Sequence, residues 1–321
     1  MLLITCQPNI LYLFDDIQYI DKVCNTNFLR PLRVIYGYNN YKKILDDNKN
    51  ISYWGSCIKN GKIFIFEGNY PENPYNNTSK IISYKYENEN LIDKKIEVDD
   101  LDFGIHEMYI YENYIYILNT YWQNIIKYNL DINQNIIKES KIIIEPFTKA
   151  LSYKYYDFNI FNEYKDKINE YRHINSMAFY NNNWYICCPY ILSLLKNKDS
   201  LNYTKYSEIE IFDKNFNYID KIILPHKGVH SIIFIDDFLL YLSFDFKLIY
   251  FDIIKKEVIH EIELDIIGYN DCWCRGICQI NKKYLLVGAN NLLQLIDNEN
   301  KKLISNYLIN KGVICTITKI F

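Results

Sequence analysis

The chain has 321 residues, of which 49% are hydrophobic, 23% are charged and 17% are aromatic. This composition is typical of a globular protein with a large core, and it excludes a disordered or collagen-like chain. The formal net charge of −3 gives no global positive field, so neither nucleic acid nor a membrane surface is expected as a partner.

The sequence also bears on the cellular location. It has no run of about 18 apolar residues, and residues 1–6 lack the charged and apolar regions of a signal peptide. The 9 Cys are an odd number, which fits free thiols in a reducing compartment better than a disulfide framework. We therefore expect a soluble, cytoplasmic protein.

Short segments rich in Ile, Tyr, Phe and Val, separated by Asn, Asp, Gly and Lys turns, recur along the chain and predict β-strands. Five segments share one ungapped frame, in which a leader residue precedes an apolar strand, a short turn and a second apolar strand. In the first copy, Asn60 and Gly61 supply a favoured hairpin turn. The copies cover residues 54–66, 106–118, 175–187, 230–242 and 275–287.

These copies predict a β-propeller. Their leaders are 52, 69, 55 and 45 residues apart, and further strands are expected at residues 125–129, 208–216, 247–252 and 293–297. Such a period, with about four antiparallel strands per unit, is typical of propeller blades. The chain has room for six blades in one domain, residues 1–321, while five or seven blades also remain open.

The two ends of the chain are expected to close the ring. Residues 312–321 resemble a sixth inner strand, and residues 9–14 could supply its neighbour. Pairing the ends in one blade would remove the open sheet edges that promote aggregation.

The long interval between the second and third copies contains an insertion. Apolar residues at positions 161, 164, 168 and 171 follow a helical spacing, which predicts a short helix over 157–171. The helix leads directly into the third leader, so it is expected at the same mouth of the channel. It could be a lid, a docking element for a partner or a surface decoration.

The leaders are the candidate functional residues. In a propeller, the innermost strands surround the central axis, so residues at equivalent positions form a ring. Four of the five leaders are polar, and two are imidazoles although the chain has only 5 His. The leaders are Trp54, His106, Asn175, His230 and Arg275.

This ring predicts a pocket for a small anionic ligand at one mouth of the channel. His106 and His230 are the candidate catalytic acid and base, Asn175 would orient the ligand, and Arg275 would hold a carboxylate or phosphate. The alternative is that these polar groups only hydrogen bond to one another and to channel water. A divalent metal is also conceivable, although no carboxylate shares the leader frame.

Nearby residues add further candidates. His173 precedes Asn175 by two residues and is expected near the same rim. Trp273 and His226 lie in the segments that enter the inner strands, from which they could reach a ligand. Three Cys within residues 272–278 are interpreted as buried thiols rather than a metal site, because a strand sends alternate side chains to opposite faces.

Four short motifs carry a resemblance to a known family. They lie at residues 104–108, 172–177, 229–231 and 274–277, and the last is followed by residues 286–288. Their order resembles a family of six-bladed β-propellers of unknown function, whose blades carry Ile-His-Asp/Glu-Leu, His-Leu-Asn-Gly-Leu, Pro-His-Ser and Arg-Gly-Leu-Ala. In the third motif an insertion separates His226 from His230, so either could match the His of the family motif. The repeat frame favours His230 as the match. The resemblance implies a propeller with a channel pocket and leaves the reaction open.

Two functions follow from the sequence. The first is an enzyme or small-molecule binder, such as a lyase or hydrolase acting on an anionic small molecule. The second is a non-catalytic scaffold that binds a peptide or protein at the channel mouth. The fold alone does not decide between them, but a scaffold does not need paired imidazoles inside the channel.

Overall fold

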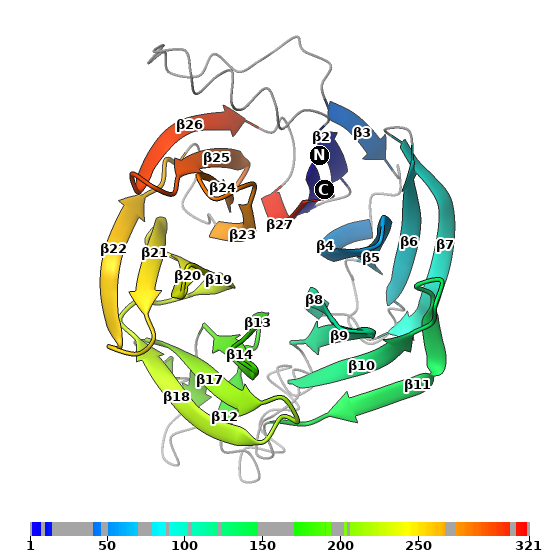
Figure 1. The fold of residues 1–321 in the computed structure, drawn as a ribbon, viewed down its shortest axis with the longest axis horizontal. Coiled ribbons are helices and arrows are strands. Elements are labelled where there is room, and N and C mark those ends of the chain that lie inside the picture. The colour runs from blue at the N-terminus through cyan, green and yellow to red at the C-terminus, as the bar shows by residue number, and fades with distance from the viewer. Residues whose placement is uncertain are drawn as a thin grey trace.

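The computed structural model describes the β-strands of the chain and most of the turns between them. The described residues are 2–7, 10–14, 41–45, 51–69, 79–87, 90–101, 105–120, 123–146, 170–189, 191–193, 202–203, 206–266, 274–308 and 313–319. Every paired strand in this part of the chain is antiparallel to its neighbour. The predicted all-β propeller is therefore confirmed, with its sheets arranged as blades around a central axis (Figure 1).

Five blades each come from one stretch of chain, and each has four strands. The first blade contains β4 (Ile51–Lys59), β5 (Lys62–Asn69), β6 (Ser79–Glu87) and β7 (Asn90–Leu101). The second contains β8 (Ile105–Tyr111), β9 (Tyr114–Asn119), β10 (Asn124–Leu130) and β11 (Ile136–Ile144). The third contains β13 (Ser176–Tyr180), β14 (Asn183–Cys188), β17 (Ser207–Asp213) and β18 (Tyr218–Leu224).

The fourth and fifth blades repeat this plan. The fourth contains β19 (His230–Ile235), β20 (Phe238–Ser243), β21 (Lys247–Asp252) and β22 (Glu257–Glu263). The fifth contains β23 (Cys274–Gln279), β24 (Tyr284–Ala289), β25 (Leu292–Asp297) and β26 (Lys302–Leu308). The first two strands of each of the five blades coincide with one copy of the repeat frame.

A further four-stranded sheet joins the two ends of the chain. Its strands, from the axis outward, are β27 (Val313–Lys319), β1 (Leu2–Gln7), β2 (Ile10–Phe14) and β3 (Tyr41–Leu45). The expected pairing of the ends is present, but the neighbour of β27 is β1, and the segment predicted for that place forms β2 instead. The extra strand β1 takes the place next to β27, where Leu3 and Ile4 are fully buried in the neighbouring cores.

The hairpin turns explain how the first two strands of the first and fourth blades meet. Asn60 and Gly61 both have positive φ, of 49° and 75°, and so do Asp236 and Asp237, at 48° and 67°. Two consecutive residues in this region form the turn whose twist matches that of antiparallel strands, and Asn, Asp and Gly adopt it at the least cost. The turn residues in the sequence therefore fix the register of these hairpins.

Packing between the sheets forms the core. Six clusters of buried apolar side chains lie between adjacent sheets, and Trp184 fills the one between the second and third blades. Each innermost strand also contacts the innermost strands on both sides, so β4, β8, β13, β19, β23 and β27 form a closed ring around the axis. This ring determines which side chains face the channel.

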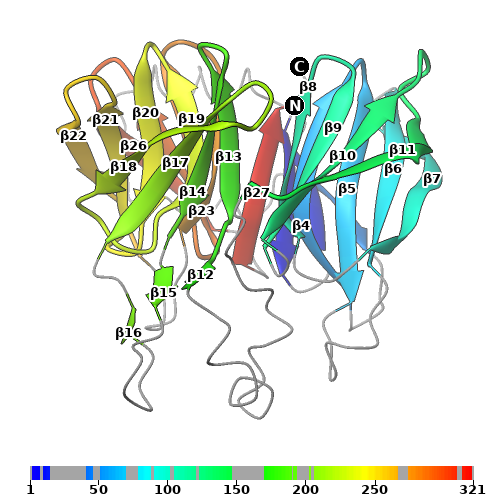
Figure 2. The same ribbon diagram turned by 90° about the horizontal axis from the view of Figure 1, so that it is seen from below.

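A small three-stranded sheet lies outside the blades. It contains β12 (Glu170–Arg172), β15 (Ile191–Ser193) and β16 (Asn202–Tyr203). Figure 2 shows it at the lower face, where β27 also begins. The side chain of Arg172 forms ion pairs with Glu208 and Glu210 of β17, and the backbone N–H of Arg172 donates to Gln123 Oε1 at 2.6 Å.

The helix expected over 157–171 is not observed in the described residues. Its last two residues, Glu170 and Tyr171, belong to β12, where pairing with β15 replaces the helical hydrogen bonds. The helix prediction is wrong there, and residues 157–169 lie outside the described part of the chain. No described residue belongs to a helix with the length and apolar character that a membrane crossing needs.

Candidate functional site

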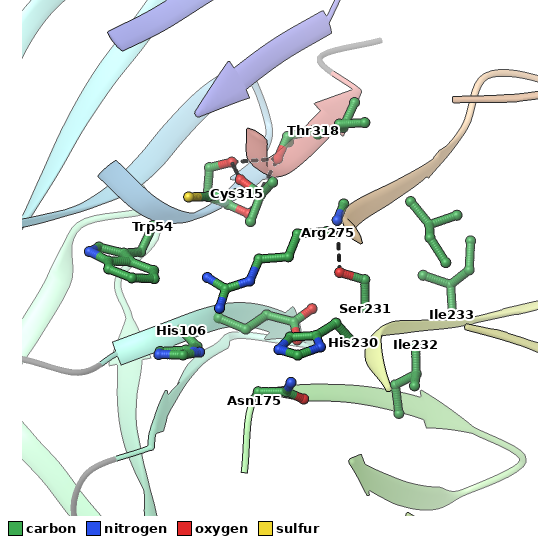
Figure 3. Close-up of a pocket in the computed structure, with 16 residues that line it drawn as sticks. Trp54, His106, Asn175, His230, Ser231, Ile232, Ile233, Arg275, Cys315 and Thr318 are labelled. Carbon is green, nitrogen blue, oxygen red and sulfur yellow. Dashed lines mark hydrogen bonds between the residues drawn. The ribbon is translucent and has the colours of Figure 1, made fainter. Parts of the chain in front are cut away.

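The inner ends of the blades enclose a cavity of about 80 Å³ on the channel axis. All five predicted leaders line it, so the structure brings together side chains that are far apart in the sequence (Figure 3). The five are Trp54, His106, Asn175, His230 and Arg275. Their binding and catalytic roles remain proposals.

A β-bulge near the start of the inner strand recurs around the ring. In β4, β8, β19, β23 and β27, one extra residue opposes the neighbouring strand, and the register shifts by one position. A bulge re-aims side chains and is common beside functional sites. Here Trp54, His106 and Arg275 lie within bulges, and His230 lies one position before its bulge.

Glycines make the bulge of β23 possible. Gly276 has a φ of +82°, which side-chain-bearing residues rarely adopt. A Cβ on Gly288 of the neighbouring strand would lie 2.3 Å from the carbonyl oxygen of Arg275. Close approach of the two backbones therefore requires glycine at 288 and sets the position of Arg275.

The ring of Trp54 lies against the guanidinium of Arg275. Its Cζ atom lies 5.3 Å from the ring centroid of Trp54. The Trp54 ring also stacks on the His106 imidazole, with centroids 5.0 Å apart and an interplanar angle of 18°. His173, which does not line the cavity, also contacts His106 in a T-shaped arrangement, with ring centroids 5.2 Å apart. This arrangement holds the cation and the imidazole in fixed positions.

His230 has a fixed tautomer. Its Nδ1 lies 2.7 Å from the carbonyl oxygen of Gly228, which can only accept a hydrogen bond, so Nδ1 carries the proton. In the neutral ring, Nε2 is then an acceptor. Gly228 has a φ of +57° and no room for a Cβ against Phe244, so the loop that positions His230 depends on glycine.

The imidazoles are held in the neutral form. Burial, and then the charge of Arg275, lower the pKa of His106 and His230 well below its usual range. The same two causes lower the pKa of His173 to about 3. These rings can therefore accept hydrogen bonds near neutral pH while they remain uncharged.

Glu107 lines the cavity and was missed as a site residue in the sequence analysis. Strict alternation would send Glu107 to the opposite side of the strand from His106, but the bulge of β8 turns both toward the axis. Its Oε2 accepts the backbone N–H of Met177 at 2.9 Å. Burial raises the pKa of Glu107 to about 8, so this carboxyl is mainly protonated at neutral pH. The only sequence signal was its position directly after a leader.

Hydroxyl groups form another part of the wall. The hydroxyl of Ser56 lies 2.8 Å from that of Thr316 and 2.6 Å from that of Thr318. The Ser231 hydroxyl accepts the backbone N–H of Gly276 at 2.8 Å, which connects neighbouring inner strands. Ser56, Ser231 and Thr316 lie in or just after the bulges, and the leader frame did not mark them.

The remaining candidates lie elsewhere. His226 does not line the cavity, because its Nδ1 contacts the Tyr241 hydroxyl at 2.9 Å and its Nε2 contacts Glu261 at 3.0 Å. His226 therefore bridges β20 and β22 away from the described cavity wall, and its role in ligand binding stays a prediction. Of His226 and His230, His230 is the one that lines the cavity. Trp273 lies outside the described residues.

The chemistry of the described cysteines is that of buried thiols. Cys57, Cys187, Cys188, Cys274, Cys278 and Cys315 are all free and buried. Within the described ranges, no group of three or more His, Cys, Asp or Glu side chains is arranged to hold a metal ion.

Comparison with known proteins identifies the fold. No protein-family model matches the sequence, and no curated protein sequence matches it. The chain is similar to one in the crystal structure of a nidogen/laminin complex, with a TM-score of 0.59 and 10% identity over 99% of this chain and 97% of that chain. It is also similar to a protein of unknown function from Bacteroides caccae, with a TM-score of 0.54 and 13% identity over 99% of this chain and 97% of that one.

A third similar structure is apo AztD from Citrobacter koseri, with a TM-score of 0.50 and 10% identity over 99% of this chain and 96% of that chain. At these identities the similarity shows the β-propeller fold alone. The motif resemblance to one particular propeller family gains no support from these comparisons.

Proposed function

We propose that this protein is a propeller that binds a small anion in its central cavity, with Arg275 as the anion-holding residue. The observation that carries the proposal is the charge of the cavity wall. Arg275 is the only Lys or Arg among the described residues that line it, and the neighbouring imidazoles are neutral. Because Glu107 is mainly protonated at neutral pH, the described part of the wall carries a net positive charge.

The placement of the Arg275 guanidinium and its planar shape also favour binding of an anion. The Arg275 guanidinium packs against Trp54, which limits the side-chain freedom that would be lost on binding. An arginine in this setting can hold a carboxylate or phosphate through two parallel hydrogen bonds. Enclosure by the blades lowers the local dielectric, which strengthens this attraction.

We further propose that the cavity is enclosed by six blades, with the sheet that joins the chain ends as the sixth. Cys315, Thr316 and Thr318 of its inner strand, β27, line the cavity. The ends of the chain therefore supply part of the binding wall as well as closing the ring.

Isothermal titration calorimetry of the purified protein with acetate and with inorganic phosphate tests the proposal. Arg275→Met removes the charge at similar side-chain size, and we expect it to weaken binding at least tenfold, about 1.4 kcal/mol. Lys256→Met is the matched control, because Lys256 is an exposed cation that pairs with Asp220 outside the cavity. Equal affinities in wild type and Arg275→Met, or no binding of either anion, would contradict the proposal.

A lyase or hydrolase reaction on the bound anion is the second candidate, and Glu107 favours it. A carboxyl with a pKa of about 8 can both give and take a proton near neutral pH, and the neutral imidazole at His106 can accept a hydrogen bond from the ligand. These groups line the same cavity as the proposed anion site.

Proton NMR in D2O tests for acid and base action in the cavity. We expect the wild type to exchange protons on the carbon next to a bound carboxylate, and Glu107→Gln and His106→Asn to lose this exchange while retaining binding. Binding without exchange in the wild type would reject this catalytic role and leave the binding function intact.

A protein- or peptide-binding scaffold is an alternative to both anion binding and catalysis, and it can be tested separately. A scaffold that uses the rim does not require an enclosed cationic cavity. If it is the function, Arg275→Met leaves partner binding unchanged, and no small anion competes with the partner.

A further inference from the structure

The carboxyl group of Glu107 has one oxygen that the protein holds and one that is free to contact a ligand. Its Oε2 accepts the backbone N–H of Met177 in β13 at 2.9 Å. Its Oε1 forms no hydrogen bond with any described residue, and this atom keeps accessible surface. A small molecule next to Oε1 could therefore form the missing hydrogen bond.

The free oxygen is accessible from the cavity. The backbone of Glu107 packs against β4, where a Cβ on Gly55 would lie 3.3 Å from the Glu107 Cα atom. The side chain is enclosed by protein on the inner strand β8, yet it is only partly buried and lines the cavity. The accessible surface of Glu107 therefore lies inside the channel and not on the outside of a blade.

At neutral pH the free oxygen carries a proton. Burial raises the pKa of Glu107 to about 8, so the carboxyl is mainly protonated, with one O–H donor. Since Oε2 accepts the Met177 N–H, the proton is assigned to Oε1. A buried donor without an acceptor is unfavourable, and an anion in the cavity would supply the acceptor.

The described titratable groups packed around Glu107 stay neutral where Glu107 titrates. Burial raises the pKa of the Cys57 thiol in β4 and of the Cys187 thiol in β14. Burial also raises the pKa of Tyr109, which lies on the same strand as Glu107. Between about pH 7 and pH 9, the change in charge in this region therefore comes from Glu107.

The charges across the cavity connect the anion to this proton. Arg275 is the only Lys or Arg in the described wall, and the imidazoles of His106 and His230 are neutral. When Glu107 is ionised, its charge balances that of Arg275, and an anion would bring an excess negative charge into a space of low dielectric. When Glu107 is protonated, the anion itself balances Arg275.

The volume of the cavity limits the size of the anion. At about 80 Å³, the cavity has roughly half the volume of an engineered apolar cavity of about 150 Å³ that takes benzene, so about three non-hydrogen atoms fit. Formate matches this size. Its two oxygens can accept hydrogen bonds from a guanidinium and from a carboxyl group.

We propose that the cavity takes up a small anion of the size of formate together with one proton, with Arg275 balancing its charge and Glu107 Oε1 donating a hydrogen bond to it. This inference rests on the proposed anion-binding function and adds a second binding residue and a pH dependence to the same site. Above about pH 8, Glu107 takes the proton from solvent as the anion enters. Below about pH 7, the proton is already in place.

Calorimetry of the wild-type protein with formate tests the inference. Titrations in buffers of different ionisation enthalpy give the number of protons taken up per formate bound. We expect about 0.1 proton at pH 7 and about 0.9 at pH 9, and a formate affinity about tenfold weaker at pH 9 than at pH 7.

Glu107→Gln connects this pH dependence to the carboxyl group. The glutamine carbonyl can accept the Met177 N–H, and the amide N–H replaces the carboxyl proton as a donor. The formate affinity of this variant should be equal at pH 7 and pH 9, without proton uptake. Glu263→Gln removes an exposed carboxyl on β22 and is the matched control, which should keep the wild-type pH dependence.

The outcomes separate the two proposals. Equal formate affinity of the wild type at pH 7 and pH 9, binding without proton uptake at pH 9, or the wild-type pH dependence in Glu107→Gln would overturn the inference while anion binding stands. Failure of formate to bind the wild type at pH 7 would instead contradict the anion-binding function on which the inference rests.

Discussion

The side-chain hydroxyl of Ser56 lies 2.6 Å from that of Thr318, although the two residues are 262 positions apart. This contact joins β4, the inner strand of the first blade, to β27, the last strand of the chain. It lies in the cavity wall, so the closure of the ring and the shape of the site depend on the same pair of side chains.

A double-mutant cycle measures this closure. Ser56→Ala and Thr318→Val each remove one hydroxyl, and a hydrogen bond of this kind contributes about 1 kcal/mol to stability. We expect the two changes to be non-additive by about that amount in urea unfolding experiments, because each removes the same contact. Additive effects within about 0.3 kcal/mol would show that the contact does not stabilise the closed ring.

Gly288→Ala is expected to damage both the fold and the site. The added Cβ would meet the Arg275 carbonyl and the side chain of Ile314, so the bulge must move. Overpacking of this kind costs about 1–3 kcal/mol, and we expect acetate affinity to fall with it. Gly61→Ala is the control, because Gly61 has a positive φ but nothing near its Cβ position. It should cost about 1 kcal/mol through backbone strain and leave acetate affinity unchanged.

The stability of the protein should fall between about pH 7 and pH 8 because of Glu107. Burial raises the pKa of this carboxyl to about 8 in the folded protein, whereas an unfolded Glu titrates near about 4.3. Between these values the folded protein binds more protons at this site than the unfolded chain. The free energy of unfolding therefore decreases as the pH rises, by up to about 1.4 kcal/mol per pH unit.

Glu107→Gln isolates this effect, because glutamine keeps an acceptor for the Met177 N–H and does not titrate. Urea unfolding at several pH values should show a flatter profile for this variant above about pH 6.5, where the imidazoles are neutral in both states. Glu263→Gln, on an exposed strand, should retain the wild-type profile. Parallel profiles for Glu107→Gln and wild type would show that the Glu107 carboxyl is not held protonated.

Acid should destabilise the protein through the imidazoles. The pKa of His173 is lowered to about 3 in the folded state by burial and by Arg275, so the folded protein resists protonation at this ring. The contribution of His173 to stability is therefore complete above about pH 6.5, where an unfolded His loses its proton, and it decreases as the pH falls below that value. His173→Gln should flatten this acidic limb in urea unfolding, while His260→Gln, at an exposed position, should leave it unchanged.

Trp54→Leu should weaken anion binding without removing the charge. The Trp54 ring lies 5.3 Å from the Arg275 guanidinium and orients it, and a contact of this kind contributes about 1 kcal/mol. Calorimetry should therefore show about a fivefold loss of acetate affinity. Tyr114→Leu removes a comparable contact with Lys127 on the outside of a blade and serves as the control. An unchanged affinity in Trp54→Leu would remove the aromatic ring from the anion site.

The sequence was sufficient for the fold because the repeat signal is local. Each copy of the frame contains two strands and their turn, and residues such as Asn60, Gly61, Asp236 and Asp237 identify the turns by their tolerance of positive φ. Alternation of apolar residues then places the leaders near the axis. The small sheet formed by β12, β15 and β16 could not be predicted in this way, because its strands have only two or three residues.

The site was only partly predictable for a different reason. Alternation alone predicts that His106 and Glu107 face opposite sides of their strand, and it does not identify Ser231 as a site residue. A bulge in each strand places these residues in the cavity wall. No simple residue pattern encodes these bulges, because they arise from contacts between strands. His226 was chosen for its chemistry and its nearness in sequence, but its hydrogen bonds hold it against Tyr241 and Glu261.

Most strand residues must both pair with the neighbouring strand and carry a side chain that suits their surroundings. At the recurring bulge, these two requirements fall on different residues. The residues on either side of the inserted residue keep the hydrogen bonds of the ladder. The inserted residue itself is unpaired, so its side chain can vary without disturbing strand pairing. Exchange of Trp54, His106 or Arg275 for another residue type would then change the chemistry of the cavity wall while the blades keep their alignment. A ring built in this way can acquire a new chemical specificity one blade at a time.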